Sequence, residues 1–527
     1  MKKKIFCILF CTLLIITSVP TINSLKNNTL SPLLSDSKPE SCSLENWIEI
    51  QKLLASDGES GELFGWSVSI SGDYAIIGAY ADDPGGSAYV FKRSGTNWTE
   101  EDKLVASDGA YADQFGWSVS ISGDYTVIGA YGDDSLRGAA YVFKRSGTNW
   151  LEEDKLFASD GESGDHFGDS VSVSGDYAII GAYGDDDHGS AYVYKRSGTN
   201  WLEEAKLVAS DGGSHFGAVS IDGDYAVIGD FAHNSAYVFK RNGTNWTETK
   251  LVASDSELGD HFGCSVAICG DYAVIGAEED DDFGHNSGAA YVFKRNGTNW
   301  TEEAKFVASD SEANDRFGVS VSTSGDYAFI GAWNDDIGRG SAYVFKRNGT
   351  NWTEEVKLVA SDGESFDNFG CSVSIDSDHA IIGAYSDDSL LGSAYIFIKE
   401  VENQPPSAPT IDGPVKGFPF ISYLFTFNTT DPDGNDVSYY IDWGDGFITN
   451  WTTYQPSTSP DYSEGHSWIG FDVFTIKVKA KDTFGLESLW TNYSFSTPRN
   501  RAINTLFINF LQNHLNLFLI LRHLMKL

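Results

Sequence analysis

The fold is decided by a short stretch, residues 64–79, which reads Phe-Gly-Trp-Ser-Val-Ser-Ile-Ser-Gly-Asp-Tyr-Ala-Ile-Ile-Gly-Ala. Small and apolar residues alternate in its first half, and a continuous apolar run follows the Ser-Gly-Asp turn. Alternation with a period of two, and short apolar runs bounded by Gly, Asp and Ser, are typical of β-strands. The stretch therefore predicts two strands, residues 64–70 and 74–79, joined by a tight turn.

This stretch recurs throughout the chain. Its Phe-Gly pair begins at Phe64, Phe115, Phe167, Phe216, Phe262, Phe317 and Phe369. The first six copies continue with an acidic loop, a Ser-Ala-Tyr-Val-Phe segment, a Gly-Thr-Asn-Trp segment and a Lys-Leu-Val-Ala-Ser-Asp segment, or close variants of them. In the first copy these segments predict a third strand over 87–92 and a fourth over 98–106. Four strands per repeat of about 50 residues are typical of a β-propeller blade.

The two ends of the repeat region complete one another. The seventh copy runs through Ser393–Phe397 and then lacks the strand that begins Asn-Trp, whereas residues 46–53 match residues 97–104. Residues 47–55 are therefore expected to form the outer strand of the seventh blade, which closes the ring and hides its open edges. The prediction is an all-β protein with a closed seven-bladed propeller over residues 47–400.

The Phe64-Gly65 opening and the Ile77-Gly78-Ala79 close resemble the FG-GAP repeat of integrin-α-type propellers. The resemblance covers residues 47–400 and implies a seven-bladed propeller, usually extracellular, that serves in adhesion or ligand binding. Calcium-binding members of that family carry an Asp-x-Asp-x-Asp-Gly-like loop between strands one and two. Here that connection is only Ser71-Gly72-Asp73, too short to wrap an ion that takes six to eight oxygens, so those sites do not carry over.

The N-terminal residues predict export. Residues 1–24 begin with three lysines and continue with the apolar run Ile5–Ile16, which is typical of a secretory signal peptide; the alternative is an uncleaved anchor. Residues 25–46 are interpreted as a spacer. Cys264 and Cys269 lie five apart on a predicted strand and so face opposite sides, and no disulfide framework or Cys-x-x-Cys metal spacing is present. The protein is expected to be secreted or displayed on the cell surface.

The composition excludes several classes of protein. The chain of 527 residues holds 36 Lys and Arg against 75 Asp and Glu, which leaves a net charge of −39. Such an acidic chain repels nucleic acid and anionic membrane surfaces. With 41% hydrophobic and 14% aromatic residues it has ample material for a packed core and is not disordered. An extracellular protein or a carbohydrate is the expected partner, and no nucleic acid.

Acidic residues gather in the loops of one propeller face. They follow the second strand at Asp82, Asp83, Asp133, Asp134, Asp185, Asp186, Asp187, Glu278, Glu279, Asp280, Asp281, Asp282, Asp335, Asp336, Asp387 and Asp388. Others precede the first strand at Asp113, Asp165, Asp260, Asp315 and Asp367. We interpret most of them as solvated loop residues; the functional alternative is a surface that binds cations, since paired carboxylates suit hard ions.

Six histidines lie in the same loops of blades three to five. His166, His215 and His261 each precede a Phe-Gly pair, and His188, His233 and His285 lie in the loops after the second strand. Together with Asp165 and Asp260 they are candidates for a transition-metal site or a ligand-binding sector, and the alternative is chance clustering. No cofactor is certain; Ca²⁺ or a transition metal is the hypothesis.

The opposite face carries glycosylation sequons. They stand at Asn97, Asn242, Asn245, Asn296, Asn299, Asn348 and Asn351. The Asn-Gly-Thr-Asn pattern also fits ordinary turn chemistry, so the sequons and the turns remain alternative explanations.

Residues 405–498 follow the linker at 401–404 and differ from the repeats. The segments 423–428, 437–443 and 474–480 alternate like strands, and Asp442-Trp443-Gly444-Asp445-Gly446 resembles the tight-turn signature of PKD domains. The resemblance implies an Ig-like β-sandwich spacer with Trp443 in its core. Asp431, Asp433, Asn435 and Asp436 are a candidate calcium cluster, or an ordinary turn, because Gly434 comes too early for an EF-hand.

Residues 499–527 form an amphipathic tail with a short predicted helix. Polar residues such as Asn509 and Asn513 interrupt its apolar run, so no apolar segment of 18 residues exists to span a bilayer. An interfacial helix or a docking tail fits better, and the tail is the expected route to any membrane association.

The sequence favours a binding protein over an enzyme. It contains no Gly-x-Ser-x-Gly, His-Glu-x-x-His or phosphate-loop motif, and no single carboxylate in an apolar setting stands out as a catalytic acid. The predicted function is a secreted or cell-surface adhesion protein that presents its acidic face to a protein or a glycan. The alternatives are a polysaccharide-active enzyme that uses carboxylates on that face, or a structural surface-layer component.

Overall fold

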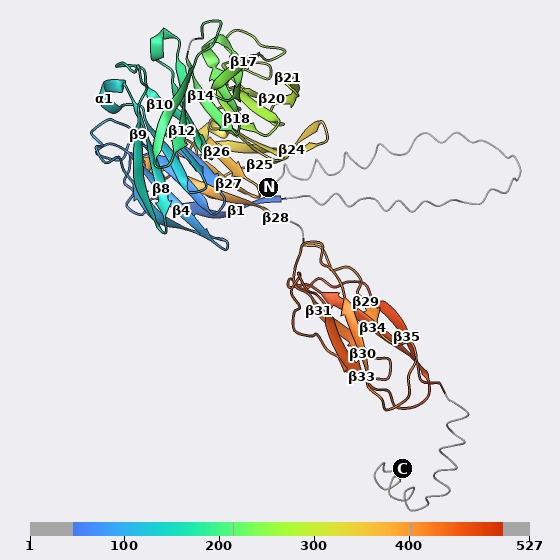
Figure 1. The fold of residues 1–527 in the computed structure, drawn as a ribbon. Coiled ribbons are helices and arrows are strands. Elements are labelled where there is room, and N and C mark those ends of the chain that lie inside the picture. Colours follow the sequence, from blue (N-terminus) through green and yellow to red (C-terminus); the bar gives the residue numbers. More distant parts are fainter. Residues whose placement is uncertain (1–45, 214, 401–402, 499–527) are drawn as a thin grey trace, which may run out of the picture. The chain divides into compact units, whose positions relative to one another are not determined.

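A computed structural model describes residues 46–213, 215–400 and 403–498 (Figure 1). The predicted signal peptide, most of the spacer and the C-terminal tail with its predicted helix lie outside these residues. No helix in the described ranges is long and apolar enough to cross a membrane.

The repeat region folds into seven four-stranded antiparallel sheets, the blades of a propeller. Blades one to three are β2 (Ser67–Ser71), β3 (Tyr74–Ala79), β4 (Ser87–Ser94), β5 (Asn97–Leu104); β6 (Ser118–Ser122), β7 (Tyr125–Ala130), β8 (Ala139–Ser146), β9 (Asn149–Leu156); β10 (Phe167–Ser174), β11 (Tyr177–Ala182), β12 (Ser190–Ser197), β13 (Asn200–Leu207). Blades four and five are β14 (Phe216–Asp222), β15 (Tyr225–Asp230), β16 (Ser235–Asn242), β17 (Asn245–Leu251); β18 (Phe262–Cys269), β19 (Tyr272–Ala277), β20 (Ala289–Asn296), β21 (Asn299–Phe306). Blades six and seven are β22 (Ser320–Ser324), β23 (Tyr327–Ala332), β24 (Ser341–Asn348), β25 (Asn351–Leu358); β26 (Phe369–Asp376), β27 (His379–Ala384), β28 (Ser393–Glu400), β1 (Asn46–Leu53). Short helices α1 (Asp133–Leu136), η1 (Asp185–Asp187), η2 (Phe231–His233), α2 (Asp335–Gly338) and α3 (Asp387–Leu390) lie between second and third strands.

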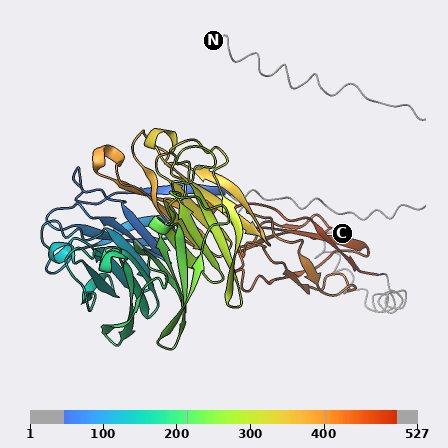
Figure 2. The ribbon, with the colours of Figure 1, turned by 90° about the horizontal axis from the view of Figure 1, so that it is seen from above.

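The N-terminal strand closes the ring, as the sequence predicts. β1 pairs antiparallel with β28, from Asn46 opposite Glu400 to Leu53 opposite Ala394. Figure 1 and Figure 2 show this blue strand beside the orange strands of the seventh blade. The described seventh blade therefore has the same four strands as the others, and the all-β propeller prediction is confirmed.

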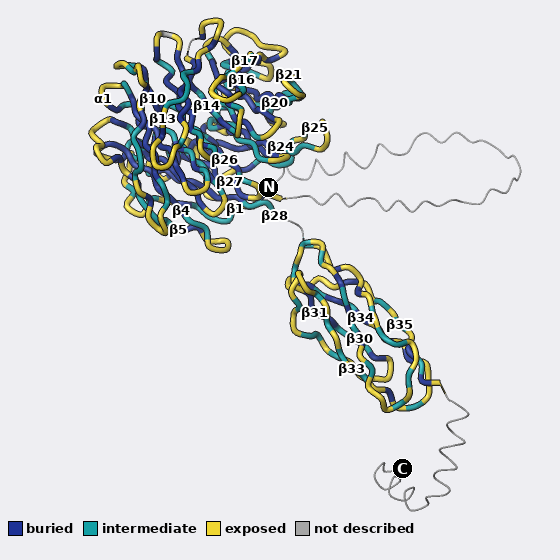
Figure 3. The backbone as a smooth tube through the Cα atoms, in the orientation of Figure 1, coloured by how far each residue is buried: buried dark blue, intermediate teal, exposed yellow. Residues whose placement is uncertain are grey.

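The hydrophobic cores lie between neighbouring blades. The second strand of each blade is buried along nearly all of its length, and β3 along all of it, because both of its faces pack against adjacent blades. Figure 3 shows buried segments inside the propeller in dark blue and exposed segments at its loops in yellow. Such strands read as continuous apolar runs rather than alternating ones. The core between blades seven and one contains Leu53, Phe64, Ile77 and Ile381, so β1 contributes to the closure with side chains as well as hydrogen bonds.

The repeated motif residues lock each blade onto the next. Phe64 packs edge-to-face on Tyr89, with ring centroids 5.4 Å apart. The Ser67 hydroxyl donates to the carbonyl of Gly116 in the next blade at 2.9 Å, and a Cβ added at Gly78 would lie only 2.0 Å from that carbonyl. The glycine of the Ile-Gly-Ala segment is therefore required, because the backbone of the next blade approaches too closely for a side chain.

Residues 403–498 form a second unit with two sheets. The three-stranded sheet contains β29 (Thr410–Asp412), β30 (Tyr423–Asn428) and β33 (Tyr462–His466); the four-stranded sheet contains β32 (Ile448–Thr449), β31 (Ser438–Asp442), β34 (Val473–Lys481) and β35 (Thr491–Ser496). One core joins them, with Phe425 from the first sheet, Ile441 and Ile476 from the second, and Trp443 and Trp468 from connections. Trp443 is 2% exposed, which confirms its predicted place in the core.

Candidate functional site

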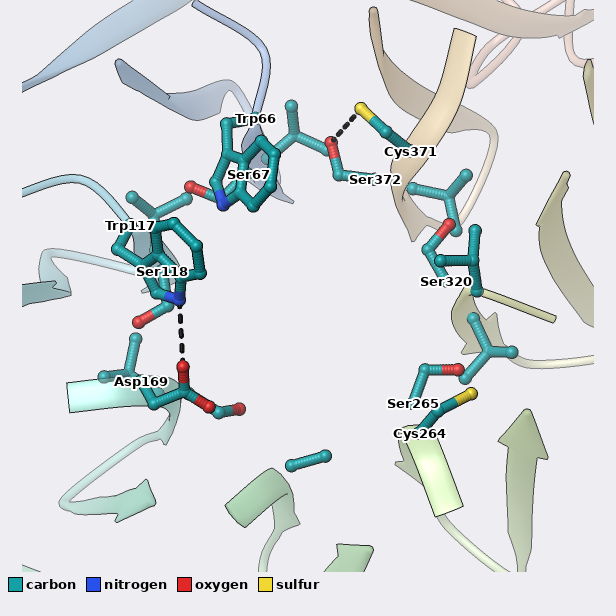
Figure 4. Close-up of a pocket in the computed structure, with 18 of the residues that line it drawn as sticks. Trp66, Ser67, Trp117, Ser118, Asp169, Cys264, Ser265, Ser320, Cys371 and Ser372 are labelled. Carbon is teal, nitrogen blue, oxygen red and sulfur yellow. Dashed lines mark hydrogen bonds between the residues drawn. The ribbon is translucent and has the colours of Figure 1, made fainter. Parts of the chain in front are cut away.

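The innermost strands of the propeller surround a cavity of about 580 Å³ (Figure 4). Serines and valines of the repeated Ser-Val pairs form most of its wall. The residue after each Phe-Gly pair also faces the cavity, and this position differs from blade to blade. It is Trp66, Trp117, Asp169, Ala218, Cys264, Val319 and Cys371 in blades one to seven. An otherwise regular repeat thus varies where it lines the cavity.

Aromatic rings form a continuous arc on the loop side of this cavity, which we call the aromatic crescent; three of its rings, Tyr385, Trp66 and Trp117, line the cavity itself. Its members come from positions beside the first and second strands of blades seven, one, two, three, four and five. In order they are Tyr385, Trp66, Tyr80, Trp117, Tyr131, His166, Tyr183, His215, Phe231 and His261. Trp66 and Trp117 lie side by side, with ring centroids 4.7 Å apart (Figure 4).

Three of the six candidate histidines belong to this crescent. The ring of His166 stacks on Tyr183 at 4.6 Å, and Tyr183 lies between it and His215. His261 contacts Phe231, and its Nδ1 lies 3.4 Å from Glu279. Burial lowers the pKa of His166 below its ordinary value of 6.5, which keeps this ring neutral near pH 7. The structure therefore brings these histidines into one arc as aromatic rings.

The other three candidate histidines have separate local partners. His188 Nδ1 lies 2.9 Å from the carbonyl of Gly213, His233 Nδ1 lies 3.1 Å from buried Asp230, and His285 Nδ1 lies 3.2 Å from Asp281. Across the described residues, no group of three His, Cys, Asp or Glu side chains is arranged to hold a metal ion.

Asp169 is the one carboxylate among the residues that line the cavity. Its Oδ1 accepts a hydrogen bond of 3.0 Å from the indole N–H of Trp117 (Figure 4). Burial raises the pKa of Asp169 to about 6, although the indole hydrogen bond favours the charged form. The expectation that no carboxylate stands in an apolar setting is thus wrong. The sequence signal that could have identified Asp169 is its place at the variable position directly after a Phe-Gly pair.

A charged sector completes the mouth on the side of blades five and six. Arg316 pairs with Glu279, and its Nη1 lies 3.8 Å from Glu278. Burial raises the pKa of Glu278, and the nearby charge of Arg316 opposes that shift. The mouth therefore combines an aromatic arc with a charged sector that continues it beyond His261, a combination of apolar surface and polar groups typical of small-molecule binding sites.

The acidic loops are built differently from the expected solvated surface. The first carboxylate of each pair is buried: Asp82, Asp133, Asp185, Asp280, Asp335 and Asp387 are 3–8% exposed, whereas Asp83, Asp134 and their equivalents are exposed. In blade one, Lys103 Nζ contacts both Asp57 and Asp82 at 2.7 Å, and Tyr89 donates to Asp57 at 2.9 Å. We call this Lys-Tyr-Asp-Asp arrangement the blade network. Buried aspartates here hold the loops in place.

The aspartates before the first strands are also buried and structural. Asp165, Asp260 and Asp315 each accept a hydrogen bond of 2.5–2.6 Å from the backbone N–H three residues earlier. Burial raises the pKa of Asp260, and it raises that of Asp315 to about 6. For these residues the solvated-loop interpretation is wrong, because each carboxylate closes its own turn.

Asp315→Asn is expected to stabilise the protein at pH 7.5 and to leave it unchanged at pH 4. The raised pKa of Asp315 means that ionisation opposes folding as pH rises from about 4 to about 6, and asparagine keeps the acceptor without the charge. After allowance for solvent screening, the free energy of unfolding should rise by about 1 kcal/mol. Thermal unfolding at both pH values measures this, with exposed Asp336→Asn as the control. A lower midpoint for Asp315→Asn at pH 7.5 would contradict the prediction.

The candidate calcium cluster of the second unit has backbone partners. Asp431 Oδ1 accepts from the N–H groups of Asp433 and Asn435 at 3.0 and 3.1 Å, and Asp436 Oδ1 accepts from Ser457 at 2.9 Å. Asn435 donates to Asn403 Oδ1 at 2.8 Å. These contacts form an aspartate-capped turn, and calcium binding here stays a prediction.

The sequons occupy the hairpins between third and fourth strands. Asn97, Asn242, Asn245, Asn296, Asn299, Asn348 and Asn351 are all exposed. Antiparallel order puts these hairpins on the face opposite the crescent, so sugars attached there would leave the cavity mouth open. Among the described residues, Cys264, Cys269 and Cys371 are free thiols.

Fold and site together define a seven-bladed β-propeller with an open, aromatic-lined cavity at its centre. The FG-GAP repeat family matches seven segments: residues 47–91, 98–143, 150–194, 201–239, 246–293, 300–345 and 352–397. These matches span more than half of the chain, so it belongs to the FG-GAP repeat family.

Comparison with solved structures gives partial similarities. The PKD domain of an M14-like peptidase from Thermoplasmatales archaeon SCGC AB-540-F20 is 36% identical over 18% of this chain and 99% of that chain, with a TM-score of 0.18. A putative 6-phosphogluconolactonase from Bacteroides fragilis is 12% identical over 62% and 98%, with a TM-score of 0.44. The periplasmic gluconolactonase of Pseudomonas aeruginosa is 13% identical over 57% and 86%, with a TM-score of 0.40. No curated protein matches the chain.

Proposed function

We propose that this protein is a secreted or cell-surface binding protein whose propeller recognises a glycan at the mouth of its central cavity. The observation that carries the proposal is the aromatic crescent around an open cavity of about 580 Å³. A pyranose ring has C–H groups on its faces and hydroxyls at its edge. Trp66 and Trp117 supply flat apolar surfaces for the faces, and Asp169, Glu279 and Arg316 supply hydrogen-bond partners for the edge.

The remaining parts of the chain fit this role. The signal-like residues 1–24 and the usual extracellular setting of FG-GAP repeats support export. We infer that residues 405–498 are a PKD-type Ig-like sandwich that serves as a spacer, supported by two sheets around one core and by the Asp442–Gly446 turn. Exposed sequons support a glycoprotein.

A binding experiment tests the proposal. The intact protein is applied to a glycan array, and affinities for the glycans it retains are measured for Trp66→Ala and Trp117→Ala. Truncating a central aromatic anchor is expected to weaken binding about 30-fold. Tyr111→Ala is the matched control, since Tyr111 is 82% exposed on the same face and outside the crescent. Undiminished binding by both tryptophan variants, or binding to proteins alone, would refute glycan recognition at this mouth.

The hydrolase alternative rests on Asp169, whose raised pKa suits an acid near pH 6. A glycoside hydrolase ordinarily needs a second carboxylate about 5–10 Å away. Asp169 is the one carboxylate among the residues that line the cavity, and Glu278 and Glu279 at the mouth lie beside Arg316. Binding is therefore favoured. Release of reducing ends from a bound glycan, lost in Asp169→Asn, would reverse this preference.

A further inference from the structure

The second unit receives and releases the chain at opposite ends of strand β34. Asn403, where the described chain resumes, donates to Asp482 Oδ2 at 2.6 Å, just beyond the C-terminal end of β34. Thr497 donates its N–H to the carbonyl of Asp472 at 2.9 Å, just before the strand begins. Nine residues of extended strand, about 30 Å, separate these points. We call the end at Thr497 the exit end.

Large apolar side chains are exposed together at the exit end. They are Val415, Phe418, Phe420, Ile469, Phe471 and Val473, each about half exposed or more. Backbone hydrogen bonds hold their loops together: Phe420 donates to Trp468 at 2.9 Å, and Ser496 donates to Val415 at 3.0 Å. We call these residues the exit-end cluster. Contiguous exposed apolar surface usually marks an interaction site.

Phe420 is held outward at a conformational cost. Its φ is +67°, a left-handed conformation that is rare for a bulky residue, yet its side chain is 70% exposed. Exposed bulky residues with a positive φ also occur in the propeller loops, at Ile337 and Phe366. The grouping of Phe420 with the other exposed apolar side chains, rather than its backbone conformation, is therefore what bears on a function.

The chain that leaves this end has a matching chemistry. Residues 499–527 contain Arg499, Arg501, Arg522 and Lys526 and no Asp or Glu, within a chain whose net charge is −39. The same segment is rich in Leu, Ile and Phe. A basic, amphipathic composition suits the interface of a lipid bilayer, where apolar groups enter the acyl boundary and basic groups meet lipid phosphates.

We propose that the exit-end cluster is a membrane-contact surface, which enters a lipid bilayer beside the point where residues 499–527 leave the second unit. The cluster residues lie in two segments, 415–420 and 469–473, and their side chains are about half exposed or more. Such exposed Phe and Ile side chains suit insertion between lipids. This inference does not depend on glycan recognition by the propeller.

Hydrogen–deuterium exchange of the full chain tests the proposal. Exchange is measured with and without vesicles of phosphatidylcholine that contain a minor fraction of phosphatidylglycerol. Vesicles are expected to protect amides in 415–421 and 468–473, and to leave those in 482–490 unchanged. Equal exchange of 415–421 on vesicle-bound protein would overturn the proposal. The amides of Gly417 and Phe420 are hydrogen-bonded within the unit, so the change caused by vesicles, and not the protection in their absence, decides the test.

A matched pair of variants separates this surface from general hydrophobicity. Phe420→Ser with Ile469→Ser is expected to lower sedimentation with the vesicles about tenfold. Phe484→Ser with Leu489→Ser removes equally exposed residues, 74% and 81%, from the opposite end and should not change it. Both double variants keep the apolar segment near the N-terminus. Any affinity of that segment for lipid therefore contributes equally to the two sedimentation measurements. Equal losses in the two variants would contradict a surface confined to the exit end.

Discussion

A chain that begins at residue 56 is expected to lose the cooperative thermal unfolding of the propeller. It lacks β1, so β28 has an unpaired edge and the core between blades seven and one loses Leu53. Trp47 and Leu53, 5% and 1% exposed, together account for about 5 kcal/mol or more of lost burial. That loss is comparable with the whole stability of a typical domain.

Two polar contacts are lost with the same strand. Lys52 Nζ lies 2.6 Å from buried Asp387, and Glu49 accepts from the N–H and hydroxyl of Ser361 at 2.9 and 2.8 Å. Differential scanning calorimetry compares chains that begin at residues 45 and 56. The longer chain should unfold normally, and a synthetic peptide of residues 45–55 should partly restore the transition in the shorter one. An unchanged midpoint in the chain from residue 56 would show that β1 is dispensable.

Lys305→Met is expected to lower the free energy of unfolding by about 3–5 kcal/mol, the usual cost of leaving a buried charge unpaired. Lys305 Nζ contacts Asp255 and Asp280 at 2.9 Å and Asp282 at 2.6 Å. Asp280 is 3% exposed, and methionine removes its cation without removing much volume. Lys294→Met is the control in the same blade, since Lys294 forms a surface pair with Glu303 at 3.3 Å and should hardly move the midpoint.

The pH dependence adds a second readout to this pair. Burial raises the pKa of Asp255, but the hydrogen bond and charge of Lys305 together with the hydrogen bond from Tyr291 outweigh burial and hold the pKa below the ordinary value of 3.8. The difference in free energy of unfolding between wild type and Lys305→Met is therefore full above pH 4 and becomes smaller as the pH falls below 4. Urea unfolding at pH 7 and pH 3 should show a narrower gap between wild type and Lys305→Met at the lower pH. Equal gaps would mean that the lysine stabilises the blade by packing alone.

The fold was predictable from sequence because the local strand and turn signals of each repeat agree with the match between the N-terminal segment and the strand that the seventh repeat lacks. The turn glycines, the apolar second strands and the Asn-Trp segment at residue 46 each specify one element. The seven Phe-Gly pairs then fix how many blades there are. Small differences arise at strand ends: Phe64 lies outside β2 and instead forms a bridge to Gly392 of the seventh blade.

The site was less predictable, since its residues meet only when the ring closes. Trp66 and Trp117 are 51 positions apart, and their contact follows from the rotation between blades. The same geometry puts Tyr183 between His166 and His215. These two histidines, which are candidate metal ligands in the sequence, therefore take part in a stack of aromatic rings. Burial of Asp82 was hidden too, because its partner Lys103 comes from another strand of the blade.

Closure of the ring by the first strand has a consequence for the timing of folding during synthesis. Asn46 pairs with Glu400, so a ribosome adds 354 further residues before β1 can find its partner. At ordinary synthesis rates this takes on the order of 20–70 s. Throughout that interval β1 is an open strand with nothing to pair with, a ready template for association with other chains. A chaperone or translocation channel that holds the first 55 residues until the last blade emerges would prevent such errors, and slow release from it should raise the yield of native protein.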